Sequence, residues 1–273
     1  MASLPAMTEP AIDHGMEAIA FEAFGVRILL AAQTPAAFER LPELLPPGSR
    51  AVPRHTVDHR LSIGADPSGT YEVSDDGVPM IQGAGLDLAL MVLDGQLRAR
   101  VALHAPDKIF VHAGVVAHMG RTMVIPGRSF TGKTTVVAAL VRAGAIYYSD
   151  EFAVFDDDGL VHPYAKPLSL RGADQAQSDH HVHDLGGVAG VEPLPVGAVV
   201  VTSYRPGAEW RPQPLSRGQA VLRLLANTVP AQTRPAEALQ AMTRAMRSAA
   251  IASESERGEA EALAPLLLAE LEP

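Results

Sequence analysis

A short glycine-rich turn constrains the fold of this chain more than any other feature. Residues 127–134 read G-R-S-F-T-G-K-T. The apolar run 122–125 precedes the turn, and residues 133–141 follow it with apolar side chains at helical spacing. The pattern G-x-x-x-x-G-K-[ST] between a strand and a helix is typical of a loop that encloses phosphate groups. The sequence therefore predicts a strand, a loop and a helix of an α/β domain.

The residue types in this loop suit a nucleotide. Glycines let backbone N–H groups surround phosphate oxygens, and the N-terminal end of the following helix attracts negative charge. Lys133 is one of only three lysines among 22 basic residues, and an arginine would not replace its compact ammonium group here. We expect Lys133 to reach the β and γ phosphates of ATP and Thr134 to bind Mg²⁺. The predicted nucleotide-binding residues are Gly127, Arg128, Ser129, Phe130, Thr131, Gly132, Lys133, Thr134 and Thr135.

Two adjacent carboxylates lie beyond the predicted helix that follows the loop. Asp150 and Glu151 come just after the apolar run 145–148. If the strand before the loop, the helix and this run form a βαβ unit, both acids emerge at the same edge of the sheet as the loop. A carboxylate there can bind Mg²⁺ or accept the proton of an attacking hydroxyl. The alternative interpretation of the two acids is an ordinary polar strand end. The alternative interpretation of the loop is a glycine-rich turn with a surface lysine.

Glycine and proline positions divide the chain into two predicted parts, 1–80 and 81–273. The first is predicted as a small α+β portion. It consists of a loose terminus at 1–18, strands at 21–32, 55–64 and 70–77, and a short helix capped by Thr34 with Pro35 in its first turn. Residues 85–105 are predicted as a helix that leads into the second part.

The second part shows strand and helix patterns in alternation. We expect strands at 109–119, 121–126, 145–155 and 197–204, a hairpin around the turn 156–159, a helix at 133–144, a helix starting at Ser216 with Gln219 in a capping box, and helices near 235–248 and 257–271. This alternation predicts an α/β fold with a partly parallel sheet.

Composition excludes several classes of protein. The chain has no cysteine, which excludes disulfides, thiolate metal sites and cysteine nucleophiles and favours a cytoplasmic location. The net charge of -9 argues against nucleic acid or an anionic membrane as the main partner. No apolar run long enough for a membrane helix and no basic, signal-like start are present in the sequence.

The segment 109–172 resembles the core of the HPr kinase/phosphorylase family. It contains a histidine-bearing strand, a second strand into the loop, a helix, and a strand that ends in two acids. The resemblance implies a P-loop kinase domain similar to phosphoenolpyruvate carboxykinase. Such a domain transfers phosphate from ATP, with Mg²⁺, to a serine of a peptide or protein, and the resembling family also forms hexamers, which makes a homo-oligomer an expectation.

Site roles follow from this resemblance residue by residue. His112 matches the family's histidine before the loop. Asp150 matches the general base toward the serine hydroxyl, and Glu151 stands where a second acid would hold Mg²⁺. The residues 169–172, S-L-R-G, resemble the family's E-x-R-G and place Arg171 where a cation steadies the transferring phosphate. Arg171 makes independent sense as a charge clamp.

The sequence also departs from the family pattern. Phe130 stands where the loop usually has a glycine, and Ser169 stands where a metal-holding glutamate is usual. The overall arrangement is closer to HPr-kinase-like proteins of peptide natural-product clusters, such as those of lasso peptides, whose substrate can be a precursor peptide. The departures leave two alternatives to the serine kinase. One is a non-catalytic nucleotide-binding or regulatory module, and the other is a small-molecule phosphotransferase.

Other polar clusters have weaker interpretations. His180, His181, His183 and Asp184 could bind a transition metal, but a polar loop that touches substrate is favoured over a metal site. For His112 itself, a core histidine bonded to a backbone carbonyl is the alternative. The segment 204–211 contains Tyr204, Arg205, Trp210 and Arg211. A loop that covers the core is favoured there over a peptide-contacting rim.

Overall fold

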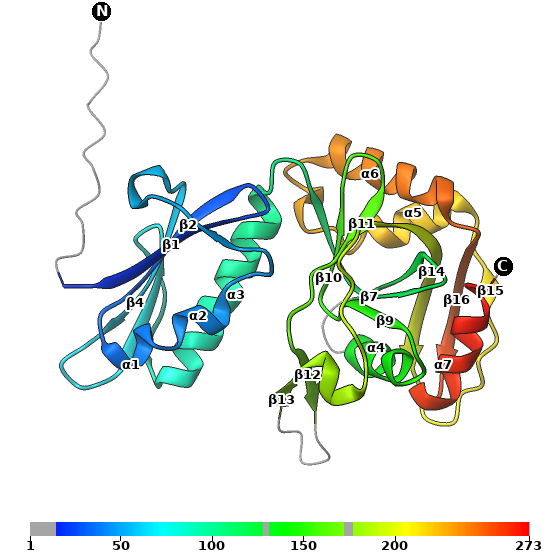
Figure 1. Ribbon diagram of the computed structural model, residues 1–273, viewed down its shortest axis with the longest axis horizontal. Helices are drawn as coiled ribbons and strands as arrows, with labels where there is room; N and C mark the ends of the chain where they lie inside the picture. The colour runs from blue at the N-terminus through cyan, green and yellow to red at the C-terminus, as the bar shows by residue number, and fades with distance from the viewer. Residues whose placement is uncertain (1–14, 128–130, 172–176, 273) are drawn as a thin grey trace, which may run out of the picture. The chain divides into compact units, whose positions relative to one another are not determined.

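The computed structural model describes residues 15–127, 131–171 and 177–272, with the side chains of 171 and 177 left out (Figure 1). Its architecture is mixed α/β, with several sheets and helices. It divides into two compact units, one of residues up to Leu45 and 49–100, the other of residues 46–48 and from Val101 onward. The predicted division between residues 80 and 81 falls inside a strand of the first unit, and the predicted loose terminus lies mostly outside the described residues.

The first unit contains a six-stranded sheet in the order β3-β1-β2-β4-β5-β6. Its elements are β1 (Glu17–Ala23), β2 (Val26–Ala32), α1 (Pro35–Phe38), α2 (Leu41–Leu44), β3 (Arg50–Ala51), the 3-10 helix η1 (Arg54–Thr56), β4 (His59–Ala65), β5 (Tyr71–Asp75), β6 (Val78–Ala84) and most of α3 (Leu86–His104). The predicted helix cap is confirmed, because the Thr34 side chain accepts a hydrogen bond from the backbone N–H of Ala37. Arg100 of α3 donates from Nε to Asp75 of β5 at 2.9 Å, which ties this helix to the sheet.

The prediction of a single strand at 21–32 was wrong. The segment is a hairpin of β1 and β2, in which Ala23 pairs with Val26. Phe24 (φ 50°) and Gly25 (φ 81°) form its two-residue turn. Positive φ at both central residues gives a twist that matches antiparallel strands. Phenylalanine rarely adopts this conformation, so the sequence offers no familiar turn signal at this point.

The second unit contains an eight-stranded sheet. Its strand order is β11-β10-β7-β8-β14-β16-β15, and β9 pairs with β7 off this path. The elements are β7 (Ile109–His118), β8 (Arg121–Pro126), α4 (Lys133–Arg142), β9 (Ile146–Ser149), β10 (Phe152–Phe155), β11 (Leu160–His162), β12 (Leu168–Arg171), β13 (Gln177–His180), η2 (Val182–Leu185), β14 (Leu194–Tyr204), β15 (Gln213–Pro214), α5 (Arg217–Leu225), η3 (Val229–Ala231), α6 (Pro235–Ser248), β16 (Ile251–Arg257) and α7 (Ala260–Ala269).

Helices cover this sheet through two apolar clusters. Val111, Val115 and Val199 pack with α5 and α6, whereas Val116 and Val200 pack with α4 and α7. Neighbouring strand residues thus alternate between the two clusters, as they do when both faces of a sheet are covered. Figure 1 shows α5 and α6 away from α4 and α7, with strands between them. The predicted partly parallel sheet is confirmed, because β8, β14 and β16 run parallel.

The sequence did not predict four strands of this unit, which are β12, β13, β15 and β16. Residues 251–257 read I-A-S-E-S-E-R and form β16, parallel to β14, with Ala198 opposite Ile251 and Tyr204 opposite Arg257. The predicted last helix therefore begins only at Ala260. The fully buried side chains of β16 are Ser253 and Arg257 rather than apolar residues, so the usual strand pattern is absent from its sequence. The predicted capping box is confirmed, since Ser216 and Gln219 bond reciprocally at the start of α5.

Among the described residues, no helix combines the length and apolar character that would be needed to cross a membrane.

Candidate functional site

A strand hairpin leads into the predicted phosphate loop. β7 and β8 are joined by Met119 (φ 49°) and Gly120 (φ 74°). At the far end of this hairpin the backbone N–H of Gly127 donates to the carbonyl of His112 at 3.1 Å. The loop thus leaves the sheet directly beside the histidine-bearing strand, and α4 begins at Lys133.

The described part of the loop needs its glycines. Gly132 has φ 83°, and a Cβ added there would lie 2.5 Å from Nη2 of Arg257. A Cβ at Gly127 would lie 2.8 Å from Oγ1 of Thr131 and 3.6 Å from Cδ of Lys133. Both contacts would force a neighbouring side chain to move, and the positive φ of Gly132 adds backbone strain to a substitution there. Arg128, Ser129 and Phe130 lie outside the described residues.

Lys133 is half-buried beside the two acids. Burial lowers its pKa, and the charges of Asp150 and Glu151 act in the opposite direction. Loss of hydration disfavours the charged ammonium, while nearby carboxylates favour it. Thr134 is also half-buried, whereas Thr135 is exposed. The structure therefore places Lys133 within the electrostatic reach of both predicted acids.

The two acids interrupt a strand. β9 and β10 both pair with β7, and Asp150 and Glu151 lie between them. The Oγ of Ser149 accepts hydrogen bonds from the N–H groups of Glu151 and Phe152 at 3.0 and 2.9 Å. The carbonyl of Glu151 accepts from the N–H of Ala113 at 3.0 Å. These bonds hold the acids at a local irregularity of the kind that re-aims side chains beside functional sites.

Asp150 is held by groups from three segments. The Tyr147 hydroxyl lies 2.9 Å from Oδ1 of Asp150 and 2.9 Å from the carbonyl of Lys166. The Thr134 side chain and the backbone N–H of Ser169 also bond to the Asp150 carboxyl group. Burial raises the pKa of Asp150, and the bonds from Thr134 and Tyr147 lower it; the burial effect is the larger. A buried carboxylate with a raised pKa is a frequent feature of catalytic bases.

The segment that resembles E-x-R-G reaches the same place. Ser169 lies in β12 opposite Asp179 of β13, and its Oγ donates to Oδ1 of Asp179 at 2.7 Å. Asp179 was not among the predicted site residues. Arg171 ends β12 with its backbone opposite Gln177, and its side chain lies outside the described part. The structure thus brings Ser169 to Asp150 but does not test the role predicted for Arg171.

His112 lies one strand away from the acids. Its ring lies 4.8 Å from the ring of Phe152, between centroids, at an angle of 33°. Its backbone N–H donates to the carbonyl of Asn227 at 2.8 Å. The side chain is half-buried. His112 therefore supports the loop through its backbone, and its predicted catalytic role stays a prediction.

Arg257 at the end of β16 is a loop contact that sequence reasoning missed. Its side chain is 2% exposed, and Nη2 donates to the carbonyl of Gly132 at 3.1 Å. Gly132 and Arg257 are 125 residues apart in the chain. No local sequence signal marks such a contact, and the strand that carries Arg257 has no apolar pattern.

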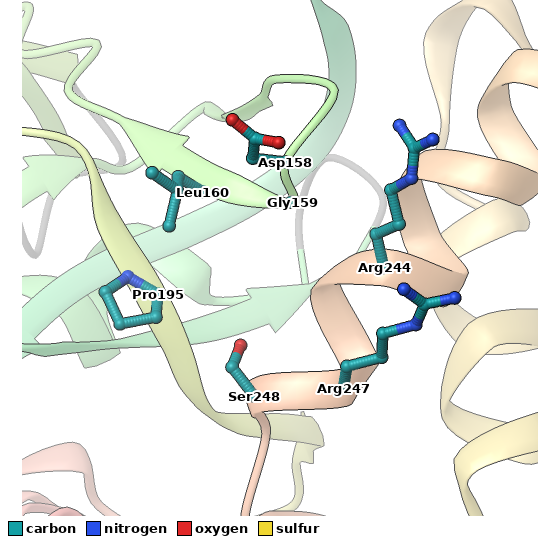
Figure 2. Close-up of a pocket in the computed structure, with 7 residues that line it drawn as sticks. All are labelled: Asp158, Gly159, Leu160, Pro195, Arg244, Arg247 and Ser248. Atoms are coloured by element: carbon teal, nitrogen blue, oxygen red, sulfur yellow. The ribbon is translucent and has the colours of Figure 1, made fainter.

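Two cavities lie in the second unit. One of about 220 Å³ borders Tyr147 and is further lined by Ala165, Lys166, Pro167, His181, Val182, His183 and Ala189. The other, of about 350 Å³, contains none of the predicted site residues. Figure 2 shows Asp158 and Leu160 on one side of this second cavity and Arg244 and Arg247 of α6 on the other. The smaller cavity is lined by Tyr147, whose hydroxyl bonds to Asp150, although Asp150 itself is not among the lining residues.

The histidine cluster does not gather into a metal site in the described part of the chain, where no group of three ligand-type side chains could hold an ion. The rings of His181 and His183 stack with centroids 5.4 Å apart. Nε2 of His183 lies 3.0 Å from Asp184. Trp210 packs against the α4 and α7 cluster, in agreement with a loop that covers the core.

Comparison of the chain with models of known protein families yields no match, and comparison with curated proteins yields none either.

Proposed function

We propose that the protein is an ATP- and Mg²⁺-dependent kinase that phosphorylates a serine hydroxyl of a peptide or protein. The observation that carries this proposal is the position of the buried Asp150 carboxyl group, which the Tyr147 hydroxyl holds at 2.9 Å and which interacts electrostatically with Lys133 of the loop. It joins a phosphate-binding pattern to a base of suitable character. We further propose that the second unit is a P-loop kinase domain of the HPr kinase and phosphoenolpyruvate carboxykinase type.

The described residues suit Mg²⁺ and a triphosphate. Thr134, Asp150 and Glu151 offer hydroxyl and carboxylate oxygens, the ligands that Mg²⁺ prefers. A side chain at Gly127 would displace the Thr131 side chain at the start of the loop. When bound, Mg²⁺ would neutralise charge on the β and γ phosphates. Thr134 and Glu151 would hold it, together with Asp150 where that carboxylate is not engaged with the acceptor.

The protein's own groups would then perform the transfer. Lys133 would bind the β and γ phosphates. Asp150 would accept the proton of the serine hydroxyl while the serine oxygen forms a bond to the γ phosphorus. The bond between the γ phosphorus and the β–γ bridging oxygen would break at the same time. The products are phosphoserine, ADP and a proton on Asp150. Arg171 is proposed to steady the charge of the transferring group.

A cavity lined by Tyr147 is the proposed place for part of the acceptor segment. The 220 Å³ cavity shares Tyr147 with the Asp150 carboxyl group, since the hydroxyl of this tyrosine lies 2.9 Å from Oδ1. Lys166 and the stacked His181 and His183 rings give this cavity polar walls. This arrangement supports a peptide acceptor, in line with the resemblance to kinases of peptide natural-product clusters.

The proposal is tested with labelled ATP, Mg²⁺ and a library of serine-containing peptides. We expect phosphate on serine, detected by mass spectrometry, and none on matched peptides with alanine in its place. Transfer to a small metabolite with none to any peptide would favour a small-molecule phosphotransferase instead.

One observation favours a non-catalytic nucleotide-binding module as a second candidate. Ser169 stands beside Asp150 where the resembling family has a metal-holding glutamate, and its hydroxyl is bonded to Asp179. This candidate predicts that Mg-ATP binds and raises the melting temperature while the γ phosphate is neither transferred nor hydrolysed. Release of labelled phosphate or ADP by the wild-type protein would exclude it.

A further inference from the structure

Arg257 is a buried cation that touches the phosphate loop. Its Nη2 donates to the Gly132 carbonyl at 3.1 Å and its Nη1 donates to the carbonyl of Gly258 at 2.9 Å. Its Nε has no hydrogen-bond partner among the described residues, and no acidic side chain described in the structure forms an ion pair with it within 4.0 Å. Burial lowers the pKa of Arg257, and the charges of Glu259 and Glu261 act in the opposite direction, so the buried guanidinium group favours negative charge nearby.

Arg257 also contacts the ring of Tyr204. The guanidinium carbon of Arg257 lies 5.3 Å from the centroid of the Tyr204 ring. The Tyr204 hydroxyl donates to Oε1 of Glu259 at 2.8 Å. The ring is thus fixed at its face and at its hydroxyl, yet the residue is 47% exposed. Gly132, Arg257, Tyr204 and Glu259 form a continuous series of contacts that begins at the phosphate loop.

Tyr204 lies on the side of the loop where the base of a bound nucleotide would lie. β8 has β7 on one side and β14 on the other. The acids that would lie beside the γ phosphate are on the β7 side, between β9 and β10. With the phosphates at the N-terminal end of α4, the opposite end of a bound nucleotide would extend to the β14 side. Tyr204 is the last residue of β14, and its partner Arg257 is the last residue of the parallel strand β16.

We infer that Tyr204 is the stacking platform for the nucleobase, and that Arg257 connects this platform to the phosphate loop. A fixed, exposed aromatic ring binds a base through its face with little loss of side-chain entropy. The inference rests on the proposed nucleotide binding and adds the base subsite to it. It assigns to Tyr204 a base contact rather than a contact with the acceptor peptide.

Two ligands distinguish binding through the base from binding through the phosphates. Affinities are measured by calorimetry for Mg-ATP and for Mg²⁺ with inorganic tripolyphosphate, using wild type, Tyr204→Ala and Tyr204→Phe. Because base stacking contributes about 1–3 kcal/mol, Tyr204→Ala is expected to bind ATP about 5-fold to 150-fold more weakly. It should bind tripolyphosphate as wild type does. Tyr204→Phe keeps the ring and should bind ATP nearly normally.

Tyr71→Ala is the matched control, because Tyr71 lies in β5 of the first unit. It should bind both ligands as wild type does. If Tyr204→Ala binds ATP with wild-type affinity, the platform is wrong, and a loss confined to peptide phosphorylation would assign Tyr204 to the acceptor. If wild type binds neither ligand, the proposed nucleotide site fails and the platform fails with it.

Discussion

Lys133 and Asp150 show opposite effects of burial at the scale of single residues. Burial lowers the pKa of Lys133 and raises the pKa of Asp150, so it favours the neutral form of each. Their mutual attraction favours the charged forms, and for Lys133 a bound triphosphate would act in the same direction. In the proposed site, nucleotide binding is therefore coupled to the charge state of both residues.

Lys133→Ala is expected to weaken Mg-ATP binding by about tenfold to a hundredfold, because a hydrogen bond to a charged group contributes about 1.5–3 kcal/mol. Lys108→Ala removes another of the three lysines, outside the loop, and should leave the affinity unchanged. Isothermal calorimetry measures both. Equal affinity of Lys133→Ala and wild type would show that the loop does not bind phosphate.

Asp150→Asn is expected to raise the melting temperature at pH 7. The raised pKa means that the folded state binds more protons than the unfolded state between the ordinary value of 3.8 and the raised value. Wild-type stability therefore falls as pH rises through this window and stays reduced above it. Asparagine does not ionise, so the advantage of the variant should disappear at pH below 3.8.

The control for this prediction is Asp107→Asn, since Asp107 is exposed. Its melting temperature should follow that of wild type across the same pH range. A lower melting temperature for Asp150→Asn at pH 7 would mean that its hydrogen bonds outweigh the cost of burying the charge.

At the scale of elements, local signals were predictable and distant contacts were not. The helix α4, the β10–β11 hairpin and the cap of α5 depend on residues adjacent in sequence, and the structure has them as predicted. β16 was missed because its buried side chains, Ser253 and Arg257, are polar. The hairpin of β1 and β2 was missed because Phe24 occupies a turn position that usually has glycine or asparagine.

The contacts of the site likewise divide into those that local sequence predicts and those that depend on distant residues. The proximity of Thr134 and Asp150 was expected from a strand, helix and strand in succession. Tyr147 and Ser169, which hold the Asp150 carboxyl group, and Arg257, which holds Gly132, act through tertiary packing. No periodicity or motif encodes such contacts, so they became visible only in the structure.

Gly132→Ala is expected to destabilise the second unit and to weaken Mg-ATP binding. The new Cβ would combine a positive φ with a 2.5 Å approach to Nη2 of Arg257. Gly207→Ala is a matched control, because Gly207 has φ 72° with no atom within 4 Å of the added Cβ. The control should lose about 1 kcal/mol of stability from backbone strain alone and keep its ATP affinity. Equal losses of stability and of ATP affinity in both variants would show that the contact between Gly132 and Arg257 has no effect of its own.

At the scale of the whole molecule, the two compact units should respond differently to nucleotide. All predicted site residues within the described parts belong to the second unit. We expect Mg-ATP to slow amide hydrogen exchange in residues 127–135 and around 150–151, with no change in β1 to β6. Hydrogen exchange followed by mass spectrometry measures this, and protection confined to the first unit would contradict the proposed site.

Phosphoryl transfer with Asp150 as the base is the central claim, and the rate of that transfer tests it most directly. The measurement uses labelled ATP, Mg²⁺ and serine peptides that the wild-type protein phosphorylates, and compares wild type with Asp150→Asn. General-base catalysis contributes about 10²–10⁴-fold, so the variant should be slower by at least about a hundredfold while it still binds Mg-ATP. Equal rates of transfer by the two proteins would contradict the role of Asp150.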